Sequence, residues 1–472
     1  MSTTTTHGNG HGRAALVERP ELEQKAAEHL WFHGWDMDWE ELTEREGLKV
    51  FARAKDSSLY DVRGHEFIDG LAGLMVVNVG HGRREIGEAM AKQAGEIAYA
   101  ASSNYTTIPT VQLAETLARI TPGDLSRVFF CSGGSEAVET ALKIVKQAQA
   151  LRGFPKRYKI IARRGSYHGM TLGAMSLTAG RQEEYYGPFM YGVSHVPSPN
   201  HFRNDFGLEG EEGDIMCARY VEQEILNQGP ETVAAVIAEP VSTSNGDHVP
   251  SPKYWQMLRE ICDKYGVFLI MDEIINGFGR TGKLFAAEHF GLTPDLMTIA
   301  KGLSSGYAPI SAVVVRPQVF EGFKEEGASI GHLLTFGGHA VATAAANKNL
   351  EILFREDLVS RSAEQGAYLL SQLQHLRSHP TVGDVRGIGL MTCVELVKGP
   401  GSTEAWGTRH PYIKTLGETV HGKGLLTRVW NQLHVSPPLV ITRDEIDRMV
   451  AIIDESLTEV EAQFAREIEA AE

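Results

Sequence analysis

Cysteine is scarce in this sequence, with four residues among 472. Cys131, Cys217, Cys262 and Cys393 stand far apart and show none of the short paired spacings of metal sites. We therefore expect no metal site and no disulfide framework. The natural inference is a reducing compartment, and we predict a cytoplasmic protein.

Long apolar runs and an excess of positive charge are also missing. No stretch approaches the roughly 18–20 apolar residues of a membrane helix, and the N-terminus has no apolar core of a secretory signal. Lys+Arg of 45 against Asp+Glu of 60 gives a net charge of −15, which disfavours nucleic acid and anionic membranes as partners. We expect residues 1–20 to form a disordered tail.

Short apolar runs alternate with helical periods over much of the chain. This alternation predicts a largely parallel sheet covered by helices on both faces. The expected strands are 59–69 (around a turn), 76–79, 128–130, 159–162, 233–238, 267–271 and 296–300, and the expected helices are 84–93, 135–152 and 252–265. From about residue 341 the pattern changes to helices 342–357 and 358–376, strands within 384–397 and a long helix 443–469. We divide the chain into residues 21–76 (the N-terminal part of a small domain), 77–340 (a large domain) and 341–472 (the C-terminal small domain).

One glycine pattern resembles a nucleotide-binding loop. Gly277 to Gly282 match G-x-G-x-x-G, and with Lys283 they nearly match a P-loop. Leu284 stands where a P-loop needs a hydroxyl for Mg²⁺, and five residues separate the glycines from the preceding strand. A nucleotide-binding or purely structural protein that uses this loop is the alternative from another functional class.

A second glycine turn has a more favourable context. Ser132-Gly133-Gly134-Ser135 joins a short strand to a strong helix. Such a turn presents free N–H groups and a helix N-terminus to an anion, most naturally a phosphate. A plain capped helix is the commoner use of the same pattern.

A lysine and an aspartate follow neighbouring expected strands. Lys301 comes directly after 296–300, and Asp272 comes directly after 267–271. Lysine is almost never fully buried unless it pairs or reacts, although a snorkelling lysine is the ordinary alternative. Lysine forms a Schiff base with an aldehyde, and a nearby aspartate keeps a pyridine nitrogen protonated. With the phosphate turn at the same sheet edge, these residues describe a pyridoxal-phosphate site.

The sequence resembles the class III (subgroup II) aminotransferases of fold type I, closest to the ω-amine and ω-amino acid:pyruvate transaminases. The resemblance runs from about His29 to Ala465 and is strongest in DEIINGFGRTGKLFAAEHFGLTPDLMTIAKGLSSGYAPI and HLLTFGGHAVATAAA. It implies an α/β fold like that of aspartate aminotransferase, with a mainly parallel seven-stranded sheet in the large domain and a smaller α+β domain. It also implies the cofactor pyridoxal 5′-phosphate.

The resemblance assigns roles around the cofactor. Lys301 resembles the Schiff-base lysine that also moves the proton, and Asp272 resembles the partner of the pyridinium nitrogen. Ile274 is similar to the apolar residue on one ring face and Tyr167 to the aromatic residue on the other. A core aromatic residue is the ordinary alternative for Tyr167.

Further roles concern the rim and the phosphate. His168 is expected to support the loop beside Tyr167, and Glu239 resembles an acid that orders Asp272, with a solvated glutamate as the alternative. Gly133, Gly134 and Ser135 fall on the phosphate turn, where Gly133 replaces the commoner serine. Thr335 resembles a threonine that reaches the phosphate of a neighbouring subunit. This implies a homodimer with shared sites, and pairing into a tetramer stays open.

The substrate pocket departs from the family pattern. Arg428 resembles the mobile arginine that binds a keto-acid carboxylate, with a surface salt bridge as the ordinary alternative. The other expected pocket positions carry smaller or more polar residues than usual or cap the entrance: Met75, Ser103, Asn104, Ser242, Ser244 and Trp31. We therefore expect a roomy, polar pocket.

The resemblance predicts a transaminase with small-molecule substrates. The expected donor is an ω-amino compound (an amine, a diamine, or an ω-amino acid such as β-alanine, 4-aminobutyrate or taurine), and the expected acceptor is a keto acid, most naturally pyruvate. The reaction would be ping-pong. Aminomutases, decarboxylases and phospholyases share the anchor residues and remain alternatives. The sequence leaves the physiological donor and the enantiopreference open.

Overall fold

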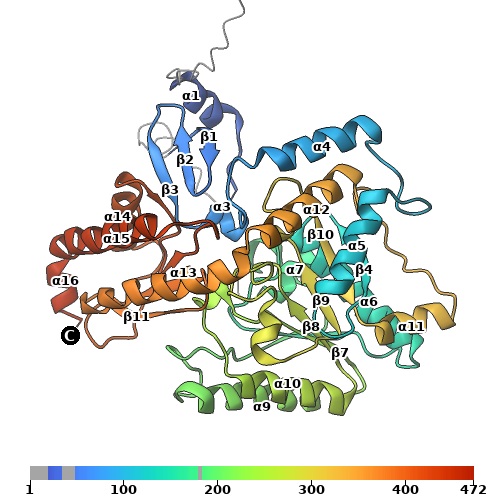
Figure 1. Ribbon diagram of the computed structural model, residues 1–472. Helices are drawn as coiled ribbons and strands as arrows, with labels where there is room; N and C mark the ends of the chain where they lie inside the picture. The colour runs from blue at the N-terminus through green and yellow to red at the C-terminus, as the bar shows by residue number, and fades with distance from the viewer. Residues whose placement is uncertain (1–19, 34–47, 179–182, 472) are drawn as a thin grey trace, which may run out of the picture.

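The computed structural model describes residues 20–33, 48–178 and 183–471 (Figure 1). Nineteen residues of the expected tail, 1–19, lie outside this described part, and Pro20 opens the first helix, α1 (Pro20–His29). Within the described ranges, no helix combines the length and the apolar character needed to cross a membrane.

A seven-stranded sheet forms the centre of the molecule. Its strands have the order β4-β10-β9-β8-β7-β5-β6. Their bounds are β4 Arg127–Cys131, β5 Lys159–Arg163, β6 Val193–Val196, β7 Val233–Ala238, β8 Phe268–Asp272, β9 Leu296–Ile299 and β10 Ser311–Val315. β10 alone in this sheet runs against its neighbours β9 and β4, so β4, β5, β7, β8 and β9 bring their carboxyl ends to one edge. The prediction of a largely parallel sheet is confirmed.

Helices cover both faces of this sheet, and each strand sends alternate side chains to the two sides. Leu269 and Met271 of β8 pack into one core cluster, whereas Phe268 and Ile270 pack into the other. This two-sided burial explains the continuous apolar runs in the sequence. The helices are α4 Arg84–Glu96, α5 Ile108–Ile120, α6 Gly134–Leu151, α7 Leu172–Leu177, α8 Glu183–Tyr186, α9 Gly210–Gln228, α10 Pro252–Tyr265, α11 Pro317–Glu325 and α12 Ala340–Arg355.

Two smaller sheets lie outside the central one. The first contains β1 (Phe51–Lys55), β2 (Ser58–Asp61), β3 (Glu66–Asp69) and β13 (Leu425–Leu426), so an early and a late segment of the chain pair. The second contains β11 (Val382–Gly387), β12 (Thr392–Leu396) and β14 (Gln432–Val435). The helices of this part are α13 Leu358–Leu373, α14 Pro411–Gly422, α15 Arg443–Gln463 and α16 Ala465–Glu469.

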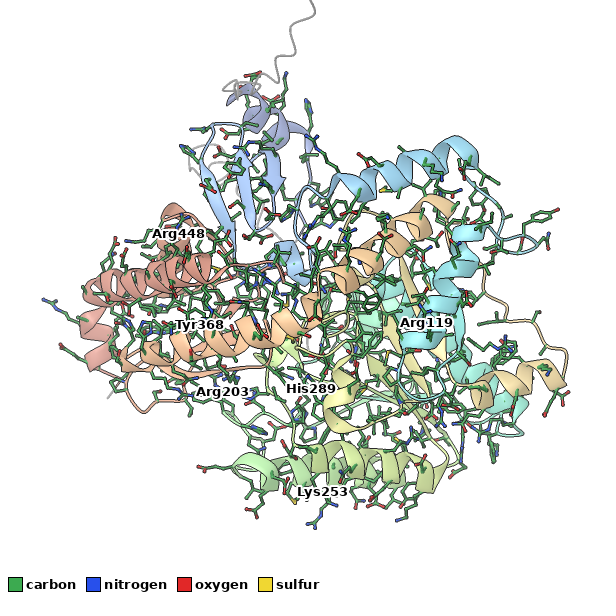
Figure 2. All side chains as sticks on the ribbon, in the orientation of Figure 1. Arg119, Arg203, Lys253, His289, Tyr368 and Arg448 are labelled. Carbon is green, nitrogen blue, oxygen red and sulfur yellow. The ribbon has the colours of Figure 1, made fainter. Side chains whose placement is uncertain are left out.

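Charged side chains join the second small sheet to the part of the chain that carries the central sheet. Arg203, in the loop before α9 (Figure 2), pairs with Glu395 of β12, which also accepts a hydrogen bond from Arg386. Arg386 Nε donates to the carbonyl oxygen of Gly246. Because Gly246 ends the 3₁₀ turn η1 (Thr243–Asn245), the small sheet holds the loop that follows β7 of the central sheet.

Some expected elements differ in the structure. Residues 76–79 are not a strand: the short helix α3 (Ala72–Met75) ends just before this stretch, and turns follow it. The expected helix 358–376 ends at Leu373 and continues as the 3₁₀ turn η4 (Gln374–Ser378), and the expected helix 443–469 breaks at Phe464. The other 3₁₀ turns are η2 Ala286–Phe290 and η3 Lys301–Leu303.

The glycine loop 277–282 has a structural use. Buried Arg280 donates through Nη1 to the carbonyl oxygens of Leu390, Ser436 and Pro437, and through Nη2 to Asn78 Oδ1 at 2.8 Å. No α-helix opens at Gly282, because only the turn η2 follows. The loop therefore fastens distant segments together.

Candidate active site

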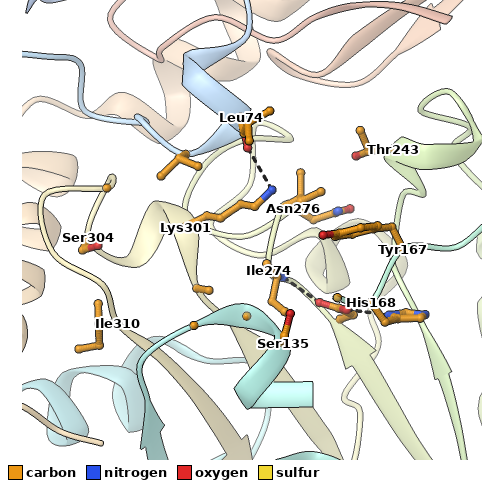
Figure 3. Close-up of a pocket in the computed structure, with 18 of the residues that line it drawn as sticks. Leu74, Ser135, Tyr167, His168, Thr243, Ile274, Asn276, Lys301, Ser304 and Ile310 are labelled. Carbon is orange, nitrogen blue, oxygen red and sulfur yellow. Dashed lines mark hydrogen bonds and ion pairs between the residues drawn. The ribbon is translucent and has the colours of Figure 1, made fainter. Parts of the chain in front are cut away.

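A cavity of about 450 Å³ opens where the carboxyl ends of the strands meet (Figure 3). Lys301, Asp272, Tyr167 and the turn Ser132-Gly133-Gly134-Ser135 all line it. No residue of the glycine loop 277–282 does. Residues up to 169 positions apart thus meet at one sheet edge, as expected for ligand sites of open α/β sheets.

Lys301 lies directly after β9 in a tight turn with φ of 41°. Its side chain is half-buried, and Nζ donates a hydrogen bond to the carbonyl oxygen of Leu74 at 3.0 Å. Burial in the protein and, to a lesser extent, the charge of Arg428 lower the pKa of Lys301 to about 8, against the opposite effect of Asp272. A substantial fraction of the amine is therefore neutral near physiological pH, as a nucleophile or base requires.

Asp272 ends β8 and is 3% exposed. Its Oδ2 lies 2.7 Å from His168 Nδ1, and its Oδ1 accepts hydrogen bonds from Thr298 Oγ1 at 3.0 Å and the Ile274 N–H at 3.1 Å. The carboxylate is thus held from two sides in a fixed orientation.

His168 connects Asp272 to a second buried acid. Its Nε2 lies 3.9 Å from Glu239 Oε2. Burial alone would lower the pKa of His168, but Glu239 and Asp272 together raise it above its ordinary value. Burial would likewise raise the pKa of Glu239, but the charges of His168 and Arg163 hold it below its usual range. Arg163 is the last member of this series of contacts, and its Nη2 donates a hydrogen bond to Glu239 Oε2 at 3.0 Å.

The N-terminus of α6 forms one end of the cavity. Gly133 is its N-cap and has no side chain to satisfy the first N–H groups. A Cβ at Gly134 would lie 3.2 Å from Ile274 Cδ1, so glycine allows the close approach of the two segments. Ser135 Oγ accepts a hydrogen bond from the Met170 N–H at 3.0 Å. The turn presents N–H groups and a positive helix end to an anion.

Tyr167 and Ile274 both line the cavity (Figure 3). The Tyr167 N–H donates to Glu239 Oε1 at 3.0 Å. Glu239 therefore holds both the backbone that carries the aromatic ring and, through His168, the acid at the end of β8. If Glu239 orders Asp272 as predicted, it acts indirectly, through His168.

Several expected substrate residues lie elsewhere in the single chain. Met75 is 3% exposed and absent from the cavity wall, whereas its neighbours Leu74 and Val76 line it. Ser244 Oγ donates to the Gly165 carbonyl oxygen, and Ser242 Oγ to Glu239 Oε1. Their hydroxyls thus serve the protein itself, and the expected polar character of the pocket does not come from them.

The remaining expected positions are on the surface of the chain. Trp31 is 87% exposed. Ser103 and Asn104 belong to an exposed turn, and Thr335 is exposed in the turn before α12. Arg428 is half-buried and is near enough to Lys301 to change its pKa, with its guanidinium 4.5 Å from the centre of the Trp430 ring.

Other residues in or behind the cavity wall did not follow from the sequence. The Leu74 carbonyl, the Thr298 hydroxyl and Arg163 all contact a candidate catalytic group or its support. Thr243 lines the cavity, and its buried Oγ1 has no hydrogen-bond partner within the described part of the chain. The only sequence signal for Thr298 was its position beside Asp272 on a neighbouring strand.

The chain matches the family model "Aminotransferase class-III" over residues 43–457. The chain belongs to the class III aminotransferases. It therefore has the fold type I architecture of that family, and class III aminotransferases use pyridoxal 5′-phosphate.

Curated relatives and a solved structure agree with this family. The chain is 36% identical to the putrescine–pyruvate aminotransferase of Pseudomonas aeruginosa, over 90% of this chain and 93% of that protein. It is 37% identical to the taurine–pyruvate aminotransferase of Bilophila wadsworthia, over 90% of this chain and 96% of that protein. The crystal structure of an (S)-enantioselective ω-transaminase from Thermomicrobium roseum matches with a TM-score of 0.90 and 38% identity, covering 93% of this chain and 98% of that one.

The cavity fits the cofactor of this family. The uncapped α6 N-terminus suits its phosphate, the fixed Asp272 suits its ring nitrogen, and Lys301 suits its aldehyde. Tyr167 and Ile274 provide an aromatic and an aliphatic surface for the ring.

Proposed function

We propose that this aminotransferase transfers an amino group from an ω-amino donor to pyruvate by a ping-pong mechanism. The donor class comprises amines, diamines and ω-amino acids of the β-alanine, 4-aminobutyrate and taurine kind. The observation that carries the proposal is that Lys301, Asp272 and the N-terminus of α6 line one cavity, and the charge of Arg428 acts on Lys301, the candidate reacting amine.

A cation beside the reacting amine suits a keto-acid acceptor. A guanidinium binds a carboxylate through two parallel hydrogen bonds, which fixes the orientation of the adjacent carbonyl group. An ω-amino donor has no carboxylate next to its amino carbon. The arginine is therefore needed when the keto acid binds, and the site must accommodate it when the donor binds. The ring of Trp430, 4.5 Å from the guanidinium, provides a second favourable position for the cation.

The cavity wall supports a flexible aliphatic donor with a polar end. Leu74, Val76 and Ile310 offer apolar contacts, while Thr243 offers a buried hydroxyl without a partner. An unsatisfied buried hydroxyl costs about 1–3 kcal/mol, and a polar group of a bound ligand would remove this cost. Putrescine and taurine, the substrates in the names of two relatives, both have a polar group at each end of a short chain.

The residues of this chain divide the work between them. The cofactor, when bound, supplies the electron sink for breaking a C–H bond next to the amino group. Lys301 would take that proton from the carbon on one side of the amino nitrogen and return it to the carbon on the other side. Asp272 would keep the ring nitrogen protonated, and the contact with His168 holds Asp272 in its orientation. The N-terminus of α6 binds the phosphate.

We also propose that the working unit is a homodimer. Thr335, the expected contributor to a neighbouring site, is exposed among exposed apolar side chains. Leu333 and Phe336 flank it at 67% and 61% exposure. Burial of this surface against a second copy would bring Thr335 toward a partner's cavity. Pairing into a tetramer remains possible in this scheme, and the four buried free cysteines are compatible with the proposed cytoplasmic location.

The test is a visible absorbance titration of the holoenzyme with single donors: taurine, β-alanine, 4-aminobutyrate, putrescine and 1-phenylethylamine. A donor in the proposed class removes the absorbance of the lysine-bound cofactor, and pyruvate restores it with alanine as the product. An aminomutase, decarboxylase or phospholyase would not consume pyruvate stoichiometrically, so a coloured protein without alanine formation contradicts the proposal.

An arginine variant tests the acceptor side. Arg428→Leu should lower kcat/KM for pyruvate by about 10–100-fold, because a charged hydrogen-bonded pair contributes about 1.5–3 kcal/mol, while putrescine keeps its ability to discharge the cofactor. Arg409→Leu, which removes an exposed arginine elsewhere in the chain, is the control. Equal losses for pyruvate and putrescine would show that Arg428 does not bind the carboxylate.

A further inference from the structure

The turn that faces Lys301 has an unusual backbone. Ala72, Gly73 and Met75 have φ values of 47°, 66° and 57° within four residues. Two of these are not glycine, and such conformations persist only where surrounding contacts enforce them. Leu74, between them, is the residue whose carbonyl oxygen accepts the hydrogen bond from Lys301 Nζ.

One buried carboxylate holds this turn. Asp69 is 2% exposed, and both of its carboxylate oxygens accept from the Gly73 N–H at 2.9 Å. Oδ1 also accepts from the Leu71 N–H at 3.3 Å, and Oδ2 lies 2.8 Å from His81 Nε2. Asp69 stands at the end of β3, so a small-sheet residue controls a loop over the large-domain cavity.

The chain after the turn also packs against the lysine segment. The Val79 N–H donates to Ser305 Oγ at 3.2 Å. A Cβ at Gly306 would lie 3.0 Å from Val76 Cγ1. Because these contacts follow Leu74 in the chain and do not involve Asp69, a change at Asp69 should move the Leu74 carbonyl without separating the two segments.

We propose that Asp69 is a positioning residue for Lys301: it sets the Leu74 carbonyl as the acceptor that holds the amine whenever the amine is not bonded to the cofactor. This inference rests on the proposed role of Lys301 as the cofactor anchor. The lysine side chain has four rotatable bonds, so a fixed acceptor shortens its search for the cofactor. A neutral carbonyl orients the amine without the strong preference for the charged form that a carboxylate would impose.

The charged groups that face Lys301 are Arg428, Asp272 and Arg280. Asp69 is not one of them, although its charge acts on Arg280. Loss of the carbonyl contact should leave the charged amine less well solvated. The pKa of Lys301 should therefore fall below its value of about 8.

Trace acetylation of the apoprotein with acetic anhydride measures this effect without catalysis. The Lys301 peptide is quantified by mass spectrometry across pH and normalised to surface lysines. In Asp69→Asn, acetylation of Lys301 at pH 7 should rise about fivefold, the effect of one ordinary hydrogen bond, and the midpoint of its pH profile should fall.

The matched control is Asp61→Asn. Asp61 is also buried in the same small sheet, accepts from the Arg63 and His65 N–H groups at 2.9 and 2.8 Å, and contacts the His65 ring, but its turn does not line the cavity. Unchanged Lys301 acetylation in Asp69→Asn, or the same change in Asp61→Asn, would overturn the proposal. His81→Gln, which removes only the ring contact, should give an intermediate rise and serves if Asp69→Asn does not fold.

Borohydride reduction of the wild-type holoenzyme separates the two proposals. Attachment of the cofactor to a residue other than Lys301 would reject the proposed anchor. The acetylation comparison would still report whether Asp69 controls the Leu74 contact.

Discussion

The two sides of the cavity are built in opposite ways. On the acid side, Asp272, His168, Glu239 and Arg163 are all buried and form one continuous chain of contacts. On the lysine side, Lys301 is half-buried, its backbone has positive φ, and a carbonyl oxygen is its hydrogen-bond acceptor.

This difference matches two chemical tasks. The acid side must keep one charge constant throughout the reaction, and a buried network of alternating acids and bases resists changes in protonation. The lysine must bond to the cofactor, detach from it and carry a proton. Several ion pairs would hold the amine in its charged form and in one place, and would slow these steps. We infer that the acid side has strong ionic contacts because its charge stays constant, and that Lys301 has a weaker, neutral contact because its amine must move.

Removal of the moving group should have the largest effect. Lys301→Ala should lower alanine formation from pyruvate by at least about 10⁴-fold, the upper range for loss of a general base, and should abolish the absorbance of the lysine-bound cofactor. Lys146→Ala, which removes another part-buried lysine with a lowered pKa, should retain activity. Near-normal turnover by Lys301→Ala would refute the division between the two sides.

Neutralisation of the constant charge should rank second. Asp272→Asn should slow amino transfer by roughly 10–10³-fold. The reason is that a nearby negative charge raises the pKa of the cofactor's ring nitrogen by about 1–3 units, and the variant loses this effect. The control is Asp295→Asn: Asp295 is equally buried and contacts Arg259 Nη1 and the Leu269 N–H at 2.8 Å, but it does not line the cavity. A greater loss of kcat in Asp295→Asn than in Asp272→Asn would contradict this ranking.

His168 contacts Asp272, and its contribution to the free energy of unfolding should depend on pH. The pKa of His168 is raised above 6.5 in the folded protein, so its stabilising charge is fully present below about pH 6.5 and is lost as pH rises through the folded value. His168→Gln should therefore reduce the free energy of unfolding by about 1.5–3 kcal/mol near pH 6, with a smaller deficit in alkaline solution. Urea unfolding at several pH values measures this; a deficit that grows with pH would show that His168 is neutral in the folded state.

Substitutions in the turn at the N-terminus of α6, the proposed phosphate site, should have the smallest effect. A Cβ at Gly133 meets no atom within 4 Å, so Gly133→Ser should fold normally and tighten cofactor binding by about two- to tenfold through one added hydrogen bond. In Gly134→Ser, the Cβ would press on Ile274, and cofactor binding should weaken. Equilibrium dialysis with the cofactor compares the two variants, and equal affinities would show that the backbone alone binds the phosphate.

The regular part of the fold was predictable from local patterns. The expected strand 233–238 and helix 252–265 coincide with β7 and α10, because two-sided burial and a Ser-Pro start give strong signals. β10 was not predicted: its run SAVVV reads as another buried strand, and its antiparallel direction depends on which strands it joins. The strand expected at 76–79 was wrong, since contacts with Asp69 and the lysine segment override the preference of Val76, Val77 and Val79 for strands.

The candidate site was predictable where one residue follows a strand and carries reactive chemistry. Lys301, Asp272 and the Gly133–Gly134 turn met this condition, and the structure places them around one cavity. The substrate positions did not follow, because side-chain direction in irregular segments depends on backbone angles: Met75, with φ of 57°, turns into the core while Leu74 faces the cavity.

The sequence by itself determined the alternation of strands and helices, the family, and the identity of the amine, the acid and the anion-binding turn, because these depend on local periodicity and on residue chemistry. The tertiary structure alone decided that His168 bridges Asp272 and Glu239 and that Asp69 shapes the turn over Lys301. Those contacts join residues 71 to 227 positions apart or bend the chain against its local preference. Only the packing of whole layers sets such distances, and no short pattern in the sequence records them.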